Sequence, residues 1–248
     1  MSRLLLGIQA VREAVRAHGD RLEKVVVAEP TNERTEALAR FAHDRGATVE
    51  RRSLGELDRV ARGGRHQGVL AWAPDLRIGE LDQLVADARK PDALVLLLDG
   101  VTDPQNFGAV IRSAVALGAT GVAWPEHGAA PLSPATFRAS AGAIEHVKLY
   151  RTRGTLDMVR ALGDVGVTTI ALDAHAPTEL GDLDLQGPVA LVIGSEDKGP
   201  KPAVRKACTH LARLPMRGPL DSLNASVAGA LAVHEVLRVR KSAVTSEG

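Results

Sequence analysis

The sequence has little cysteine and few aromatic residues. Cys208 is the single cysteine among 248 residues, so an internal disulfide is impossible, and we expect its thiol to be inert packing. Phe, Trp and Tyr make up only 2% of the residues, which excludes a broad platform of aromatic side chains for stacking bases. If the chain binds RNA, backbone and shape contacts should dominate, with Phe107 as a candidate for stacking.

Long apolar runs and metal-binding patterns are absent too. No apolar run approaches the roughly 20 residues of a membrane-spanning helix. The apolar start of the chain is interrupted by Gln9 and Arg12, too early for a secretory signal, so we expect a cytoplasmic protein. The eight histidines are scattered, and His234-Glu235 continues as Val-Leu-Arg instead of completing a zinc motif. We therefore expect no metal site.

The charge is nearly balanced, and the formal net charge of +1 neither favours nor excludes nucleic acid as a partner. Residues 1–74 carry a small excess of cations, 13 Lys and Arg against 10 Asp and Glu. These cations include Arg12 and Arg16, one helical turn apart, the pair Arg51-Arg52, and the run 62–65. They form either a basic face for phosphates or an ordinary solvated surface, and the sequence leaves both open.

Apolar periodicity divides the chain into two α/β domains. Residues 1–74 predict a small unit, with a first helix carrying Ile8, Val11 and Val15, strands at 24–28, 47–50 and 68–72, and helices at 32–45 and 54–60. Residues 75–92, rich in Pro, Gly and charge, predict a linker. Residues 93–242 alternate strands (93–98, 121–124, 167–172, 189–193, 210–214) with helices (106–117, 134–143, 155–162, 202–206, 222–240). This alternation predicts a parallel sheet covered on both faces, followed by a frayed tail at 243–248.

The first candidate motif is DGVTDPQNFGAVIRSA, residues 99–114, after a predicted buried strand. It lacks the glycines of a dinucleotide or P-loop motif, but it offers Asp103, Asn106 and Arg112. Asn106 and Arg112 are six helical residues apart, roughly 9 Å of rise and about 120° of rotation, so they do not share a face. We expect Arg112, among small and apolar neighbours, to be partly buried with an anionic partner, as a functional residue or in a structural salt bridge.

Two further polar turns follow apolar strands. In LVIGSEDKG, residues 191–199, Gly194 and Gly199 bracket four polar residues at the carboxyl end of a strand, where parallel sheets bind ligands. In LPMRGPLDSLNASVAGALAVHE, residues 214–235, Ser222 and Asn224 open a predicted helix with a stripe of small residues, Ala225, Gly229 and Ala232. Each segment alone could be an ordinary turn or a tight packing contact.

Taken together and in this order, the three segments closely resemble the three motifs of the SpoU (TrmH-like) RNA 2′-O-ribose methyltransferases of the SPOUT superfamily. The match covers about residues 93–240, and SAGAIEHVKLYR at 140–151 is similar to the segment these proteins carry between motifs one and two. Near the N-terminus, GIQAVREAV and GRHQGVLA are similar to the substrate-binding domain of longer members.

The resemblance implies a SPOUT-type parallel sheet with a trefoil knot near the C-terminus, preceded by a small L30e-like α/β domain that binds RNA. It implies a homodimer with active sites at the subunit interface. It also implies S-adenosylmethionine, bound in a bent form by backbone groups near Gly194, Leu214 and Leu223, with Ile193 and Met216 close by.

For the chemistry, the resemblance implies catalytic roles for Asn106 and Arg112 in motif one, Glu196 in motif two, and Ser222 and Asn224 in motif three. Family proposals make Arg112 the base, but a guanidinium pKa lies above ~12, so we favour Arg112 as a cation that stabilises the forming 2′-alkoxide. Asn106 would orient Arg112 or the ribose, and Glu196 would accept the proton or fix Arg112.

One residue departs from the family pattern, which usually has Gly after the motif-two Glu. This chain has Asp197 there, followed by Lys198, and Pro200 and Pro202 stiffen the next turn. The resemblance is strongest to members that methylate a guanosine of 23S rRNA. A tRNA 2′-O-methyltransferase and a non-catalytic RNA-binding protein on the same scaffold are the alternatives.

Overall fold

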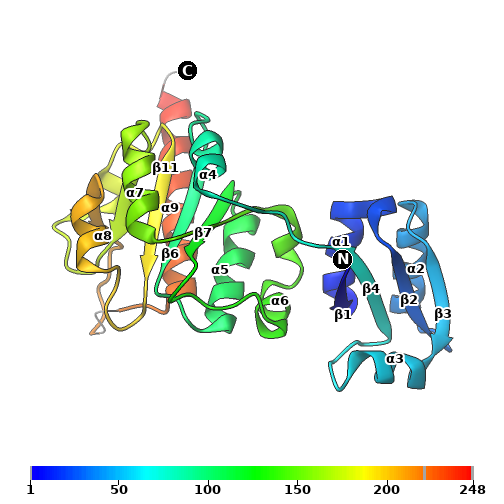
Figure 1. Ribbon diagram of the computed structural model, residues 1–248. Coiled ribbons are helices and arrows are strands. Elements are labelled where there is room, and N and C mark those ends of the chain that lie inside the picture. Colours follow the sequence, from blue (N-terminus) through cyan, green and yellow to red (C-terminus); the bar gives the residue numbers. More distant parts are fainter. Residues whose placement is uncertain (1, 220–221, 247–248) are drawn as a thin grey trace. The chain divides into compact units, whose positions relative to one another are not determined.

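The computed structural model describes residues 2–219 and 222–246, and their contacts divide the chain into two compact units (Figure 1). The first unit comprises residues 1–76 and the short segment 141–146, and the second comprises 77–140 and 147–248. Residues 75–92, predicted as a linker, contain β5 (Ile78–Gly79) and α4 (Leu81–Ala88), and both belong to the second unit.

The first unit is a four-stranded sheet in the order β1-β4-β2-β3. Its elements are β1 (Ser2–Leu6), α1 (Ile8–His18), η1 (Gly19–Arg21), β2 (Lys24–Glu29), α2 (Glu33–Asp44), β3 (Val49–Ser53), α3 (Leu54–Ala61) and β4 (Val69–Pro74). Asn32 and Thr35 form a capping box that begins α2, and Ser53 and Glu56 form one that begins α3. Buried Val11 and Val15 of α1 contribute to the core, as their helical spacing predicts.

The segment 141–146 adds η2 (Ala143–His146) to the first unit, although it lies in sequence between two elements of the second. The Glu145 side chain is only 1% exposed and accepts a hydrogen bond from Arg3 Nη2 at 2.8 Å. Its Oε2 also lies 2.8 Å from His18 Nε2. Two cationic or hydrogen-bonding side chains thus offset the cost of burying this carboxylate.

The second unit is an eight-stranded sheet in the order β10-β12-β9-β11-β6-β7-β8-β5, and every neighbouring pair is parallel. Its strands, besides β5, are β6 (Leu94–Asp99), β7 (Gly121–Pro125), β8 (Lys148–Thr152), β9 (Thr168–Leu172), β10 (Thr178–Glu179), β11 (Val189–Gly194) and β12 (His210–Arg213). The α/β class and the parallel sheet are therefore confirmed.

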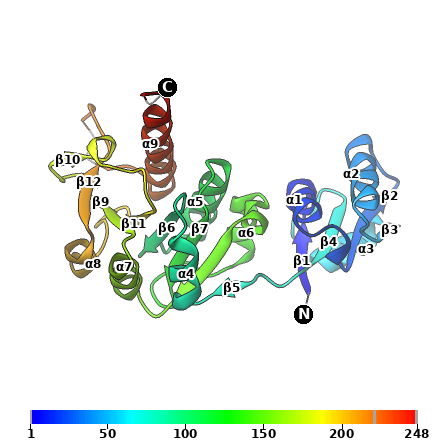
Figure 2. The same ribbon diagram turned by 90° about the horizontal axis from the view of Figure 1, so that it is seen from above.

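Helices cover both faces of this sheet (Figure 2). On one face, α4, α7 (Thr155–Asp164) and α8 (Pro202–Ala207) pack in a core with Val95, Leu97 and Val192. On the other face lie α5 (Pro104–Ala116), α6 (Pro134–Ser140) and α9 (Ala225–Ser246), with α9 against Leu96 and Ile193. All six residues of β6 and of β11 are buried, as expected of central parallel strands.

Some predicted boundaries are wrong for identifiable reasons. The helix predicted at 134–143 ends at Ser140, because Ala141 and Gly142 adopt positive φ angles of 49° and 85°. The helix predicted from 222 begins at Ala225, because the Asn224 side chain accepts the Ser226 N–H and caps the first turn. That helix continues through 243–246, where a frayed tail was predicted, and the rest of that tail, 247–248, lies outside the described residues.

Among residues 2–219 and 222–246, none of the helices is both long enough and apolar enough to span a membrane. The sheet order explains where a ligand site can form. Because β11 lies between β6 and β9, and β12 lies beyond β9, the carboxyl ends of these four strands meet at one edge. The loops that carry the three candidate motifs leave from that edge.

Candidate functional site

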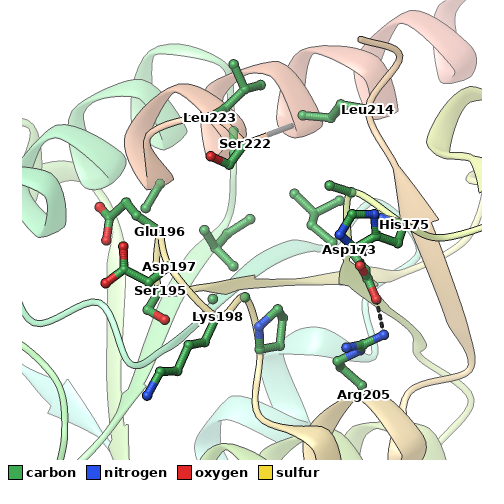
Figure 3. Close-up of a pocket in the computed structure, with 18 of the residues that line it drawn as sticks. Asp173, His175, Ser195, Glu196, Asp197, Lys198, Arg205, Leu214, Ser222 and Leu223 are labelled. Carbon is green, nitrogen blue, oxygen red and sulfur yellow. Dashed lines mark hydrogen bonds and ion pairs between the residues drawn. The ribbon is translucent and has the colours of Figure 1, made fainter. Parts of the chain in front are cut away.

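A cavity of about 470 Å³ lies at the carboxyl ends of β9, β11 and β12 (Figure 3). Its walls come from the end of β9 and the residues after it (172–175), the end of β11 with its following loop (193–200), Arg205, and the segment after β12 (Leu214, Met216, Ser222 and Leu223), together with Ala225 and Ala228 of α9. The volume lies in the range of small-molecule sites, about 300–1,000 Å³. The second and third candidate motifs therefore meet around one cavity.

The shape of this cavity depends on a close backbone crossing at Gly194. A Cβ atom at this position would lie 2.0 Å from the carbonyl carbon of Gly199 and 2.1 Å from the nitrogen of Pro200. The loop returns to Gly194 because the Gly199 N–H donates to the Ser195 carbonyl at 2.9 Å, and Gly199 adopts a φ of 62°. Gly194 is therefore required sterically.

The predicted cofactor-binding residues all line the cavity. Ile193, Leu214, Met216 and Leu223 form an apolar wall, with Ala225 and Ala228 of α9 beside them. Figure 3 shows Leu214 and Leu223 together on one side of the cavity. Residues from three separate segments of the chain thus meet at one cavity, as the family resemblance implies.

A polar group at the end of β9 was missed. Asp173 follows β9 directly, is 9% exposed, forms an ion pair with Arg205 of α8, and accepts the His175 N–H at 3.0 Å. All three line the cavity, on the side away from Glu196 (Figure 3). The signal was available, since polar residues at the carboxyl end of a parallel strand adjoin the ligand edge.

At the other end of the cavity, hydrogen bonds join the three motifs through Asn106. Asn106 Nδ2 donates to Glu196 Oε1 at 2.6 Å, and Asn224 Nδ2 donates to Asn106 Oδ1 at 3.0 Å. Asn106 lies in the first turn of α5, where its N–H donates to the capping residue Asp103 at 2.7 Å. Both functional groups of this amide are thus used, and Asn106 is held between the motif-two loop and the start of α9.

Arg112 differs from the expectation. Its side chain is exposed on α5, and among the residues that the structure describes it has no ion pair and no hydrogen bond. The prediction of partial burial is wrong, because residues 107, 108, 110, 111 and 114 form the buried face of α5 and leave 112 on the outer one. The anionic partner that was also predicted is not found within 2–219 and 222–246.

The remaining motif residues divide between the cavity and solvent. Glu196, Asp197, Lys198 and Ser222 all line the cavity, and of these only Glu196 is partly buried, whereas the other three are exposed to solvent at its rim. Pro200 is buried where the loop crosses Gly194. The small residue Gly229 does not mark a close backbone approach, because a Cβ there would lie 3.7 Å or more from its neighbours, an ordinary contact distance.

Cys208 does not line the cavity, and its thiol is held in the protonated form. Burial raises the pKa of the Cys208 thiol to about 12, with hydrogen bonding to Thr169 opposing the shift and the charge of Asp99 adding to it. Such a thiol is almost entirely protonated at neutral pH. Within 2–219 and 222–246, no group of three or more His, Cys, Asp or Glu side chains is arranged to hold a metal ion.

Two family profiles match the chain over nearly its whole length. The SpoU rRNA Methylase family matches residues 93–234, and the family described as RNA 2′-O ribose methyltransferase substrate binding matches residues 4–78. The first match contains every candidate motif and more than half of the chain.

The individual proteins that match the chain are also described as methyltransferases. A protein described as an uncharacterized tRNA/rRNA methyltransferase from Mycolicibacterium vanbaalenii is 34% identical over 243 residues, covering 97% of this chain and 77% of its own length. The TrmH family tRNA/rRNA methyltransferase YacO of Bacillus subtilis is 35% identical over 239 residues, covering 95% of each chain. The SpoU methyltransferase AviRb of Streptomyces viridochromogenes, solved with AdoMet, superposes with a TM-score of 0.77 at 26% identity, covering 97% of this chain and 91% of AviRb.

Proposed function

Because the chain belongs to the SpoU family of RNA methyltransferases, we propose that it transfers a methyl group from S-adenosylmethionine to a ribose 2′-hydroxyl in structured RNA. The observation that carries this proposal is the contact of Asn106 with Glu196, at 2.6 Å, beside the cavity. This hydrogen bond holds the side chain of Asn106, from motif one, at the edge of a pocket made by motifs two and three. A methyl donor and a hydroxyl acceptor need such adjacent sites.

The cavity suits S-adenosylmethionine by size and by lining. Ile193, Leu214 and Leu223 offer an apolar wall for a purine, and the backbone around Gly194 can approach a ligand closely because no side chain intervenes. Met216 completes this wall. The AviRb structure was solved with the same cofactor, which supports its use here.

The residues around the bound ribose would help its 2′-hydroxyl, which is a weak acid, to lose its proton. When bound, S-adenosylmethionine supplies an electrophilic methyl group. In the transfer, the bond from the 2′-oxygen to the methyl carbon forms as the carbon–sulfur bond breaks, and the hydroxyl proton leaves. Glu196 is the candidate acceptor of that proton, and Asn106 fixes the carboxylate orientation. Arg112, exposed and without an ion pair among the described residues, is available to stabilise the alkoxide or the adjacent phosphate.

The two motif-three residues would complete this side. Asn224, which caps α9, donates a hydrogen bond from its side-chain Nδ2 to Asn106. Its side-chain Oδ1 accepts hydrogen bonds from Ser226 N and Oγ at 2.9 and 2.6 Å. Asn224 is thus fixed at both ends of its amide. Ser222 lines the cavity and is placed to contact the cofactor or the ribose.

The first unit would bind the RNA. Its match to the substrate-binding family supports this role. Arg62 and Arg65, on the loop that follows α3, are exposed and have no ion pair among the residues the structure describes, which supports a basic face over an ordinary solvated surface. Arg51, by contrast, is paired with Glu36 at 2.9 Å and is less available to phosphates.

We further propose the homodimer, the trefoil knot and the L30e-like N-terminal domain that the family resemblance implies. Val227 and Leu231, one turn apart on α9, are each 45% exposed, and a second copy of the chain would cover them. Such a partner would approach the end of α9 that carries Asn224. A monomeric mass in solution would contradict the shared interface.

The proposed target is a guanosine of 23S rRNA, with tRNA as the alternative. The decisive experiment combines calorimetry with S-adenosylmethionine and mapping of 2′-O-methylation across rRNA and tRNA, with and without the protein. We expect cofactor binding and one 23S guanosine whose methylation depends on the protein. A dependent tRNA nucleotide would favour the alternative target. Absence of cofactor binding would favour a non-catalytic RNA-binding scaffold.

A further inference from the structure

We propose that Asp99 is a positioning residue for the cofactor, because it holds closed the loop that forms one wall of the cavity. Asp99 is the last residue of β6 and the register partner of Gly194 in β11. It does not line the cavity, so it would act through the loop. The inference depends on the proposed cofactor, and its experiments separate the two claims.

The Asp99 side chain is fully buried, with 0% exposure, and both carboxylate oxygens have donors from other elements. Oδ2 accepts the backbone N–H of Lys201 at 2.8 Å, and Oδ1 accepts the hydroxyl of Thr155 at 2.9 Å. The Lys201 ammonium lies 3.5 Å from Oδ1, but that side chain is 62% exposed. Burying a carboxylate is costly without such donors, so its placement here is specific.

The two oxygens connect Asp99 to different parts of the unit. Thr155 is the first residue of α7, which belongs to the scaffold on one face of the sheet. Lys201 directly follows the loop 195–200, whose residues all line the cavity. The Oδ1 contact therefore stabilises the scaffold, and the Oδ2 contact fixes the end of the loop.

The position of Lys201 matters because of the crossing at Gly194. The peptide between Gly199 and Pro200 lies directly against Gly194, and one backbone hydrogen bond, from Gly199 to Ser195, closes the turn itself. Lys201 comes next, and Asp99 holds its N–H beside the same Gly194. Without that bond the loop can move away from β11, which would widen the cavity and reduce contact with a bound ligand.

Variants of Asp99 and Thr155 separate the two oxygens. Asp99→Ala should raise the Kd for S-adenosylmethionine about tenfold or more, because a hydrogen bond to a charged acceptor is lost. Asp99→Asn should recover most of that affinity, because its amide oxygen can still accept from Lys201 while its NH₂ donates to Thr155. Thr155→Val should lower the melting temperature yet change the Kd less than about twofold, because it leaves the loop contact intact.

Lys201 tests the same bond from the donor side. Its backbone angles, φ −56° and ψ 145°, are ones that proline adopts, so Lys201→Pro removes the N–H while residue 201 keeps the same backbone angles. Lys201→Ala keeps the N–H and serves as the matched control. The proline ring would displace the Asp99 carboxylate, so Lys201→Pro and Lys201→Ala are also compared in the Asp99→Ala background. In that background Lys201→Pro should raise the Kd for S-adenosylmethionine by less than about twofold.

The readouts are the Kd by calorimetry, KM and kcat for methyl transfer, and the melting temperature of each full-length variant. Val159→Ala, a core change in α7, controls for loss of stability and should leave the Kd unchanged. An increase in KM with little change in kcat supports the proposal. If the wild-type chain does not bind S-adenosylmethionine, the proposed function fails. If it binds and Asp99→Ala binds equally well, or Asp99→Asn gives no recovery, the role of Asp99 is overturned.

Discussion

The two sides of the candidate site are built from different parts of the chain. The proposed cofactor side consists of backbone and apolar contacts around Gly194, Leu214 and Leu223, with the peptide after Gly199 packed against β11. The proposed ribose side consists of side chains from three segments, joined by hydrogen bonds through Asn106, with Arg112 exposed six residues further along α5.

Because the two sides are built differently, we expect cofactor affinity and turnover to respond to different substitutions. The backbone part of the first side tolerates most side-chain changes and is damaged where a Cβ cannot fit or where the loop loses its support. A surface made of side chains loses function when one group is removed, although the pocket itself persists. Substitutions on the first side should change cofactor affinity, and substitutions on the second should change kcat.

The largest effect is expected for Gly194→Ala. The added Cβ would lie 2.0 Å from a backbone carbon, so the loop must move, and we expect no calorimetric binding of S-adenosylmethionine and no methyl transfer. Gly163→Ala in α7 is the matched control. A Cβ there meets nothing within 4 Å, so binding should persist and stability should rise by about 0.5–1 kcal/mol. Unchanged binding in Gly194→Ala would contradict the backbone-built cofactor side.

Arg112→Ala should have the next largest effect, on kcat alone. Removing a cation that stabilises developing charge typically costs about 10²–10³-fold in turnover. The Kd for S-adenosylmethionine should stay within about twofold, because Arg112 does not line the cavity. Single-turnover methyl transfer and calorimetry measure the two quantities. Arg160→Ala, another exposed arginine of the same unit, should leave both unchanged. Full activity in Arg112→Ala would remove this residue from the chemistry.

Asn106→Ala should reduce kcat by about tenfold, because it disconnects Glu196 from Asn224. A double-mutant cycle with Glu196→Gln measures the connection. Because the two side chains share a 2.6 Å hydrogen bond, their effects on kcat should be non-additive by about 0.5–3 kcal/mol. Strict additivity would mean that Asn106 and Glu196 act separately, and the ribose side would then not be one network.

The sequence was most informative where structure follows from local pattern. The buried strands β6 and β11 and the cavity-lining Gly194 were predicted, because apolar runs and glycine-bearing turns are local signals, whereas Leu223 was implied only by the family resemblance. Strand β8 was missed because KLYRT is only five residues long and neither alternates apolar and polar residues nor forms a continuous apolar run. The family resemblance, more than periodicity, connected the motifs to one another.

Contacts between distant residues could not be predicted in the same way. Arg112 was expected to be buried because its sequence neighbours are apolar, but the helix phase places it on the outer face. The role of Asp99 also depends on register, since only the pairing of β6 with β11 places it beside Gly194 and Lys201. The helical spacing of the apolar residues in α5 contains the first piece of information, whereas the strand register behind the second cannot be read from sequence spacing.

The smallest effect is expected for Cys208, which lies between α8 and the first residue of β12 and does not line the cavity. With its pKa raised to about 12 by burial, only about one thiol in 10⁴ is ionised at pH 8, so alkylation of the folded protein should be slow and should become fast on denaturation. Cys208→Ala should leave the Kd and kcat within about twofold, because the thiol packs among apolar side chains and does not line the cavity. Rapid labelling at pH 8 that also abolishes cofactor binding would show that a side chain outside the cavity controls cofactor affinity.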